Sequence, residues 1–458
     1  MDGSLPAEKA RPVDAAGSEE LADSGQDFRT PVKLRLIRVA KIMALSSLAL
    51  FVLLRGIIPA MSGIENDFPG YYTAAKIVAD GGEARRLYDD AWFREQIRRY
   101  GLEDPRNPGK FAPFPPPTAL LLIPLASLRP LTALRVVVVV NVLCMGLAAL
   151  LLRKTFAWPM LECALFVLAS GLGIVSGLRY GQPYILISTF CLLGYYLYLS
   201  GRPWLAGASL GLFVPIKYFP VVPLVCLTFR REWRVAVGGA IVILAVALIS
   251  VGVLGWQVHR IFLSSVFGNH LIGQLGLSGR TVPFTAVYQS FDTLIDRLFV
   301  LDPTWNPQPL LDAPGLRVVT LVIIKSALVM VAAATLVGLA RRDGVVAAAP
   351  AIGVLGILVL LIAPATATYT FVLLWQPVAL LAAYFLSRAE RTATCIILVT
   401  YVLIGFIPYG HTYPFEGRGG LSVLAFPRLW LMLAMFIASI WFLALPRAHG
   451  QRNAHVPA

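Results

Sequence analysis

The chain has 458 residues, of which 57% are hydrophobic and only 14% are charged. A soluble globular protein carries about a quarter of charged residues, so this composition favours a membrane protein. The net charge of +14 does not indicate nucleic-acid binding, because Lys and Arg cluster in short loops between apolar runs and no basic patch is interleaved with aromatic residues.

The polar N-terminal residues 1–32 have no apolar run typical of a signal peptide, so we expect a disordered cytoplasmic tail. Basic residues then precede the first apolar run, at Lys33, Arg35, Arg38 and Lys41. Because positive charges mark the cytoplasmic side, they predict a first span over 42–58 with the N-terminus inside.

Residues 59–117 are amphiphilic and are predicted to form the first extracytoplasmic loop, with short surface helices over 71–78 and 91–100. The prolines at 113 and 115–117 stop any helix there. Residues 118–128 are apolar but too short for a crossing, since a span needs about 20 residues. They either dip into the membrane or precede the second span.

Further apolar runs predict spans over 131–152, 157–177, 184–200, 235–255, 316–340, 345–363, 369–387, 392–408 and 425–445. The loop 256–315 is expected on the same outer side as the first loop, and the tail 447–458 is expected inside. The prediction is an all-α polytopic membrane protein with about 10–12 transmembrane helices in one domain over 33–446, both termini being cytoplasmic.

The segment 204–229 contains Pro215, Lys217 and Pro220 in its middle. A single crossing would place the arginines that follow it outside, against the positive-inside rule. We therefore predict a broken or re-entrant helix pair, which is tolerated where protein or water covers the irregular backbone.

Two carboxylates, Glu65 and Asp67, stand just past the outer end of the first span. A carboxylate there can accept a proton from a hydroxyl, although position alone favours solvated loop charges, which are the more common case. Lys217 lies in an apolar run, where a charge is either functional or reaches to the membrane surface.

Other polar candidates follow in the predicted outer loops. Arg179 suits phosphate and Gln182 suits a sugar, but an interfacial anchor explains them as well. Arg280 and Gln289 in one loop and His411 in another also suit a sugar site, without being specific for it.

The sequence contains no Walker loop, no dinucleotide-binding glycine motif, no HExxH and no GxSxG. The five cysteines all lie in apolar runs without metal-ligand spacing. We therefore expect no cofactor, no metal site and no disulfide framework.

Four motifs in order resemble glycosyltransferase family 87. They are the run from Asp67 through Tyr71 and Tyr72, the run Phe114-Pro115-Pro116-Pro117, the pair Gly181-Gln182 followed by Lys217-Tyr218-Phe219-Pro220, and Tyr288-Gln289-Ser290 with a later Pro364. The resemblance covers roughly residues 40–390.

The resemblance implies a GT-C fold and a mannosyltransferase that uses a polyprenyl-phosphate-sugar donor and a glycolipid or polysaccharide acceptor at the bacterial inner membrane. It implies that Asp67 is the general base, with Glu65 as a lesser candidate. It also makes Tyr71, Tyr72 and Tyr369 candidates for substrate binding. Many members carry a histidine shortly after the proline that matches Pro364, but this chain continues Ala-Thr-Ala-Thr-Tyr369, so the donor sugar or the activity itself is open.

The expected reaction is an inverting displacement, in which Arg179, Lys217 and Arg280 are candidates to stabilise the leaving lipid phosphate. A transporter or flippase of lipid-linked saccharides is the first alternative, although its expected inverted repeats are not evident. A polymerase or ligase of such saccharides, or an inactive family member, is the other.

Overall fold

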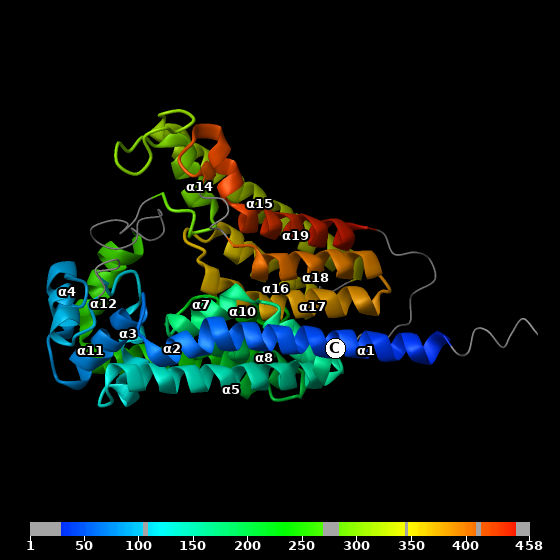
Figure 1. Ribbon diagram of the computed structural model, residues 1–458, viewed down its shortest axis with the longest axis horizontal. Helices are drawn as coiled ribbons and strands as arrows, with labels where there is room; N and C mark the ends of the chain where they lie inside the picture. The colour runs from blue at the N-terminus through cyan, green and yellow to red at the C-terminus, as the bar shows by residue number, and fades with distance from the viewer. Residues whose placement is uncertain (1–28, 104–108, 269–283, 344–346, 409–413, 446–458) are drawn as a thin grey trace, which may run out of the picture.

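The computed structural model describes residues 29–103, 109–268, 284–343, 347–408 and 414–445 (Figure 1). These residues form helices and turns, without a strand longer than one isolated bridge between Asp302 and Asn306. Most of the helices lie side by side along the long axis of the molecule. The protein is therefore an all-α polytopic membrane protein, as the sequence predicts.

The first span is longer than expected. Helix α1 (Arg29–Val52) passes through a π-helical turn (Leu53–Ile57) into α2 (Ile58–Ser62) without a break. The first loop then holds α3 (Phe68–Ala79) and α4 (Asp90–Arg99), close to the two surface helices predicted from the sequence. The Asp89 side chain accepts a hydrogen bond from the Trp92 amide at 3.1 Å, which caps the start of α4.

The predicted third span is broken into two helices. After α5 (Pro130–Phe156), the chain forms α6 (Met160–Leu168) and α7 (Leu172–Arg179), which bend by 67° at a short break. Gly171 in the break has φ +42°, and a Cβ there would lie 2.7 Å from the carbonyl oxygen of Gly405. The bend therefore depends on close backbone packing against a helix more than 200 residues later in the chain.

The segment after α8 (Tyr184–Leu199) forms two short helices, α9 (Pro203–Gly211) and α10 (Val221–Phe229), on either side of a non-helical turn. The Tyr198 hydroxyl donates to the Glu232 carboxylate at 3.1 Å. Because Tyr198 lies at the end of α8 and Glu232 follows α10, the chain returns after α10 to the end of α8 that it left.

Close glycine contacts hold α9, the first helix of this pair, against α11 (Trp233–Leu254). A Cβ on Gly207 would lie 2.1 Å from the Val235 carbonyl oxygen, and one on Gly211 would lie 2.5 Å from that of Gly239. Only glycine allows two backbones this close, since any Cβ would clash. The turn between α9 and α10 is thereby held at a defined height in the bundle.

The later helices are α12 (Trp256–Ile261), a π-helical turn (Phe262–Val266), α14 (Phe291–Phe299), α15 (Pro314–Asp343), α16 (Ala348–Ile362), a 3-10 helix (Thr368–Leu374), α17 (Trp375–Ser387), α18 (Arg391–Phe406) and α19 (Pro427–Ala444). Short 3-10 helices also occur at Ala84–Arg86, Pro116–Leu120, Ile123–Leu125 and Gly419–Ala425. Within the described ranges, six helices are long and apolar enough to cross a membrane, or seven if the bent pair α6–α7 counts as one span. The shorter apolar helices α8, α16 and α18 accompany them. The total of ten to twelve crossings and the domain boundaries remain predictions.

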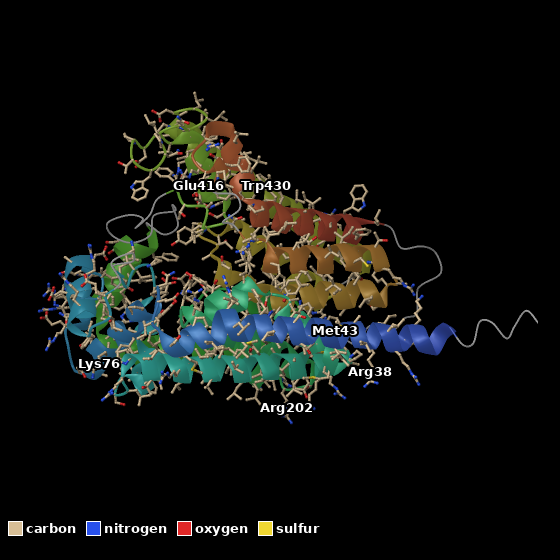
Figure 2. All side chains as sticks on the ribbon, in the orientation of Figure 1. Arg38, Met43, Lys76, Arg202, Glu416 and Trp430 are labelled. Atoms are coloured by element: carbon tan, nitrogen blue, oxygen red, sulfur yellow. The ribbon has the colours of Figure 1, made fainter. Side chains whose placement is uncertain are left out.

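The two ends of the bundle differ. Helices α3, α4 and α12 gather at one end, beyond α2, whereas the N-terminal part of α1 projects from the other (Figure 1). Figure 2 shows Lys76 of α3 near the first end and Arg38 of α1 near the second. The loops that follow α2, α7 and α16 meet at the first end, and they form the site described next.

Candidate functional site

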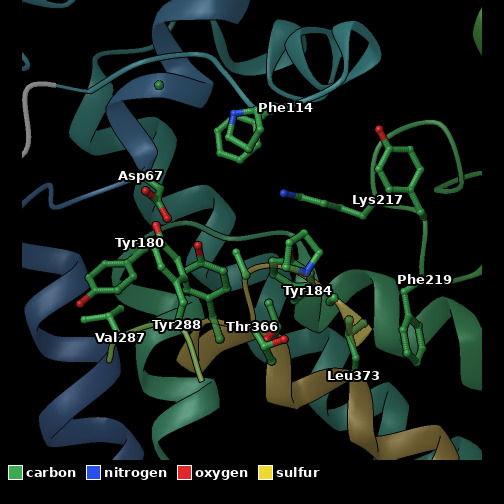
Figure 3. Close-up of a pocket in the computed structure, with 18 of the residues that line it drawn as sticks. Asp67, Phe114, Tyr180, Tyr184, Lys217, Phe219, Val287, Tyr288, Thr366 and Leu373 are labelled. Carbon is green, nitrogen blue, oxygen red and sulfur yellow. The ribbon is translucent and has the colours of Figure 1, made fainter. Parts of the chain in front are cut away.

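A cavity of about 680 Å³ lies at the end of the bundle where α2 gives way to α3. Six segments that are distant in the sequence line it: residues 65–70, 109–115, 180–184, 216–219, 285–288 and 359–373. Asp67 and Lys217 extend into it from opposite sides, with Phe114 and Tyr184 between them (Figure 3). This volume is in the usual range for a ligand pocket, about 300–1,000 Å³.

Asp67 occupies the N-cap position of α3, but its side chain does not cap the helix. Pro69 in the first turn has no amide hydrogen to offer. The carboxylate instead accepts a hydrogen bond from Gln182 Nε2 at 2.6 Å and another from the Tyr369 hydroxyl. The side chain is therefore held by residues from later helices and lines the cavity.

Burial raises the pKa of the Asp67 carboxyl above its ordinary value. The hydrogen bond from Tyr369, the Lys217 ammonium and the hydrogen bond from Gln182 each lower that pKa, but burial is the larger effect. A carboxylate with a raised pKa is a better proton acceptor.

Lys217 stands in the turn between α9 and α10, bracketed by Pro215 and Pro220. Its ammonium lies 4.3 Å from the centre of the Phe114 ring and 5.1 Å from that of Tyr184. Within the described part of the chain, Lys217 makes no ion pair within 4.0 Å. The aromatic faces stabilise the cation while leaving it open to an anion in the cavity.

Tyrosines form much of the remaining wall. Tyr369 stacks on Tyr184 with ring centres 5.3 Å apart and meets the edge of Tyr180 at 6.3 Å. Tyr288 reaches the cavity from the loop before α14 (Figure 3). Aromatic faces with hydroxyl groups at their rims suit the apolar faces and the hydroxyls of a sugar ring.

Glu65 and Arg179 form an ion pair at the edge of the cavity, with Oε2 and the guanidinium nitrogen 2.6 Å apart. The sequence proposed Glu65 as a second acid and Arg179 as a phosphate ligand. The structure has each neutralising the other. Asp67 and Lys217 are charged groups that face each other across the cavity, and Lys110 also lines it.

Four other residues that were substrate-binding candidates do not line the cavity. The hydroxyl of Tyr72 donates to the Leu128 carbonyl at 2.6 Å. Gln289 donates to the Ala286 carbonyl and accepts from the Arg428 amide, which ties two loops together. Tyr71 and Gln182 are buried behind Asp67. The pattern of residue types alone did not distinguish these interior polar groups from exposed ones.

The lining also contains Tyr184, Lys110 and Thr366, none of which was singled out from the sequence. Tyr184 opens a helix directly after Gly181-Gln182, and this position was the only available signal for it. Arg280 and His411, the remaining candidates, lie outside the described residues.

Among the residues that the structure describes, no three His, Cys, Asp or Glu side chains come close enough together to hold a metal ion. Asp67 has Tyr369 and Gln182 as its hydrogen-bond partners, and Glu65 has Arg179. The expectation of a metal-free site remains a prediction.

A sequence model of glycosyltransferase family 87 matches residues 111–364, more than half of the chain. Comparisons with curated proteins and with solved structures gave no match. The matched segment contains Phe114, Tyr184 and Lys217 of the cavity wall, while Asp67 precedes it. The chain therefore belongs to glycosyltransferase family 87 and is a membrane glycosyltransferase.

Proposed function

We propose that the protein transfers a hexose, mannose being the first candidate, from a polyprenyl-phosphate-sugar to a lipid-linked or polysaccharide acceptor. The observation that carries this proposal is that the Asp67 carboxylate faces the Lys217 ammonium across an aromatic cavity, and that Lys217 has no ion pair within the described ranges. A base and an anion-binding group are what a sugar phosphate and an attacking hydroxyl require.

In the proposed reaction, the acceptor hydroxyl oxygen attacks the anomeric carbon and its proton passes to Asp67. The bond between the anomeric carbon and the phosphate oxygen breaks, and the electron pair leaves on the lipid phosphate. Lys217 stabilises the charge that develops there. A single displacement inverts the anomeric configuration, and Glu65 is held by Arg179 rather than offering a second nucleophile.

The two ends of the cavity suit the two parts of the donor. Tyr180 and Tyr288 lie on the Asp67 side, whereas Phe219 and Leu373 lie beyond Lys217 (Figure 3). The sugar would then occupy the tyrosine side and the phosphate the Lys217 position, so that the polyprenyl chain leaves over apolar side chains. Such a donor needs no nucleotide-binding fold.

We further propose that this site faces the extracytoplasmic side of a bacterial inner membrane. Lys33, Arg35, Arg38 and Lys41 surround the start of α1, at the end of the bundle opposite α3. Positive charge marks the cytoplasmic side. Both termini are then cytoplasmic and the cavity opens outside.

The test is sugar transfer by the purified protein in detergent, with a panel of radiolabelled polyprenyl-phosphate sugars and an acceptor glycolipid extract. Wild type is compared with Asp67→Asn and with the matched control Asp80→Asn. Asp80 caps the other end of α3, and its carboxylate pairs with Lys76 at 2.9 Å, outside the cavity. We expect transfer by wild type and the control, and a loss of about 10²–10⁴-fold in Asp67→Asn.

Detergent removes the two sides of the membrane, so transfer there excludes a pure flippase. Equal transfer by wild type and Asp67→Asn would refute the role of Asp67. Transfer only from lipid-diphosphate-linked oligosaccharides would indicate a polymerase or ligase, and no transfer from any donor would favour the transporter or the inactive member.

A further inference from the structure

We propose that Gln182, together with Tyr71, is a positioning residue that orients the Asp67 carboxylate for proton transfer and stabilises its ionised form by a hydrogen bond. This inference rests on the proposed role of Asp67 as the general base. It replaces the expectation that Gln182 binds the sugar, because its side chain is fully buried and does not line the cavity.

Two hydrogen bonds connect the three side chains in one direction. The Tyr71 hydroxyl donates to Gln182 Oε1 at 2.8 Å, and Gln182 Nε2 donates to Asp67 Oδ2 at 2.6 Å. A carboxylate only accepts hydrogen bonds, so the amide NH₂ must face Asp67 and the amide oxygen must face Tyr71. If the Gln182 side-chain amide rotated by half a turn, its oxygen would face the Asp67 carboxylate and the bond to Asp67 would be lost.

The backbone around Gln182 fixes the position of this amide. Gly181 adopts φ +59°. The backbone N–H of Gln182 donates to the Gly177 carbonyl at 2.9 Å, and this bond closes the C-terminus of α7. A Cβ on Gly181 would lie 2.4 Å from the Phe68 ring. Pro183 then leads directly into α8, so the turn is fixed on both sides.

Tyr71 is fixed as firmly. It lies one helical turn after Asp67 on α3, is 1% exposed, and stacks on Phe114 with ring centres 4.5 Å apart and planes 17° apart. The same Phe114 ring lies under the Lys217 ammonium. The hydrogen-bonded series Tyr71–Gln182–Asp67 is therefore packed against the same aromatic ring that holds the Lys217 ammonium.

The other groups that face Asp67 come from three elements. Tyr369 donates from the 3-10 helix, Tyr184 faces it from α8, and Lys217 faces it from the α9–α10 turn. Glu65 on the same loop is occupied by Arg179. Gln182 and Tyr369 both stabilise the ionised carboxylate by hydrogen bonds, but only Gln182 does so from outside the cavity, where no substrate touches it.

Removing the hydrogen bond from Gln182 should raise the pKa of Asp67. The hydrogen bond from Gln182 lowers the pKa of Asp67, against the larger effect of burial. Without that bond the pKa rises further, and the acid limb of the rate profile moves to higher pH. Because a hydrogen bond to a charged group is a strong one, we expect a shift of about one pH unit, a tenfold change in the acid dissociation constant.

The experiment compares Gln182→Met, Tyr71→Phe and Tyr72→Phe. Methionine keeps the unbranched shape of glutamine and removes both hydrogen-bonding groups. Tyr72→Phe is the matched control, because its hydroxyl bonds the Leu128 carbonyl and has no connection to Asp67. The pH dependence of kcat/KM is measured for all three, together with the KM for the donor.

We expect the acid limb to move up by about one pH unit in Gln182→Met, by less in Tyr71→Phe and not at all in Tyr72→Phe, with the donor KM unchanged. A lower plateau with an unmoved limb would overturn the proposal, since packing alone explains it. A raised donor KM with an unmoved limb would also overturn it, in favour of sugar binding by Gln182.

A second measurement needs no substrate. Infrared difference titration of the purified protein follows the carboxyl C=O stretch that disappears in Asp67→Asn. If wild type transfers no sugar but this band titrates at higher pH in Gln182→Met, the proposed function fails and the positioning role stands. An identical midpoint in both proteins would overturn the positioning role.

Discussion

Replacing Lys217 by Met removes the only charge that the proposed mechanism places against the leaving phosphate. The ammonium lies against the Phe114 and Tyr184 rings and lines the cavity. Methionine preserves the unbranched shape and the contacts with the aromatic rings. The variant therefore tests the charge rather than the packing.

The expected loss of kcat in Lys217→Met follows from the charge of the ammonium and its distance from the phosphate. An ammonium about 4 Å from a phosphate oxygen contributes about 4 kcal/mol at the effective dielectric constant of about 20 that suits protein sites. Part of this attraction is already present in the bound donor, so only the increase in the transition state affects kcat. Removing one preorganised group that stabilises developing charge lowers kcat by about 10²–10³-fold, and we expect this range.

The assay is single-turnover transfer from the labelled donor at saturating concentration, for wild type, Lys217→Met, Lys217→Arg and Lys76→Met. Lys76 pairs with Asp80 on the outer face of α3, so Lys76→Met loses a lysine without affecting the cavity (Figure 2). Lys217→Arg keeps the charge and should retain more activity than Lys217→Met. Transfer by a folded Lys217→Met within fivefold of wild type would refute the assignment of Lys217 to the leaving group.

Three further outcomes are expected. Burial raises the pKa of Asp67, and the base must be ionised to accept a proton. On acidification, kcat/KM should therefore fall at a pH above the ordinary aspartate value of 3.8. An acid limb at or below that value in the pH profile would contradict the assignment of Asp67 as the base. Glu65→Gln should keep transfer within about tenfold of wild type in the same assay, since Glu65 serves Arg179 rather than the acceptor, and a loss as large as that of Asp67→Asn would make Glu65 the base. Arg297→Met leaves the Glu416 carboxylate, which is 10% exposed, without its ion-pair partner and with the Ala286 amide as a remaining donor. The fold should lose about 3–5 kcal/mol of stability, seen as a lower midpoint in thermal unfolding in detergent. Addition of Glu416→Gln to that variant should restore part of the loss, and an unchanged midpoint in the single variant would show that the pair is not buried in solution.

The local features of the sequence predicted the helices well, because their causes are local. Apolar runs of about 20 residues can cross a membrane only as helices, since every backbone amide must be bonded internally. Pro215 and Pro220 likewise interrupt the helix between them, because a proline has no amide hydrogen for the helical bond; α9 ends at Gly211, before Pro215, and α10 begins at Val221, after Pro220. The position of Asp67 beyond the first span was visible for the same reason.

The bend between α6 and α7 was not predictable in this way. Residues 157–177 are predominantly apolar, with Glu162 as their one charged residue, so their composition indicates one span. The break occurs because the backbone at Gly171 packs against Gly405, and this contact exists only once α18 is in place.

Some features of the site were likewise predictable from the sequence, whereas others depend on tertiary contacts. The sequence by itself determined a membrane-embedded helical protein with a carboxylate after its first span and a lysine between two broken helices. Only the tertiary structure decided that Asp67 meets Gln182, 115 residues away, and that Glu65 meets Arg179, 114 residues away. The same residue types serve as ligand, ion pair or interior support, and which of these applies depends on burial and on partners that folding brings from distant parts of the chain.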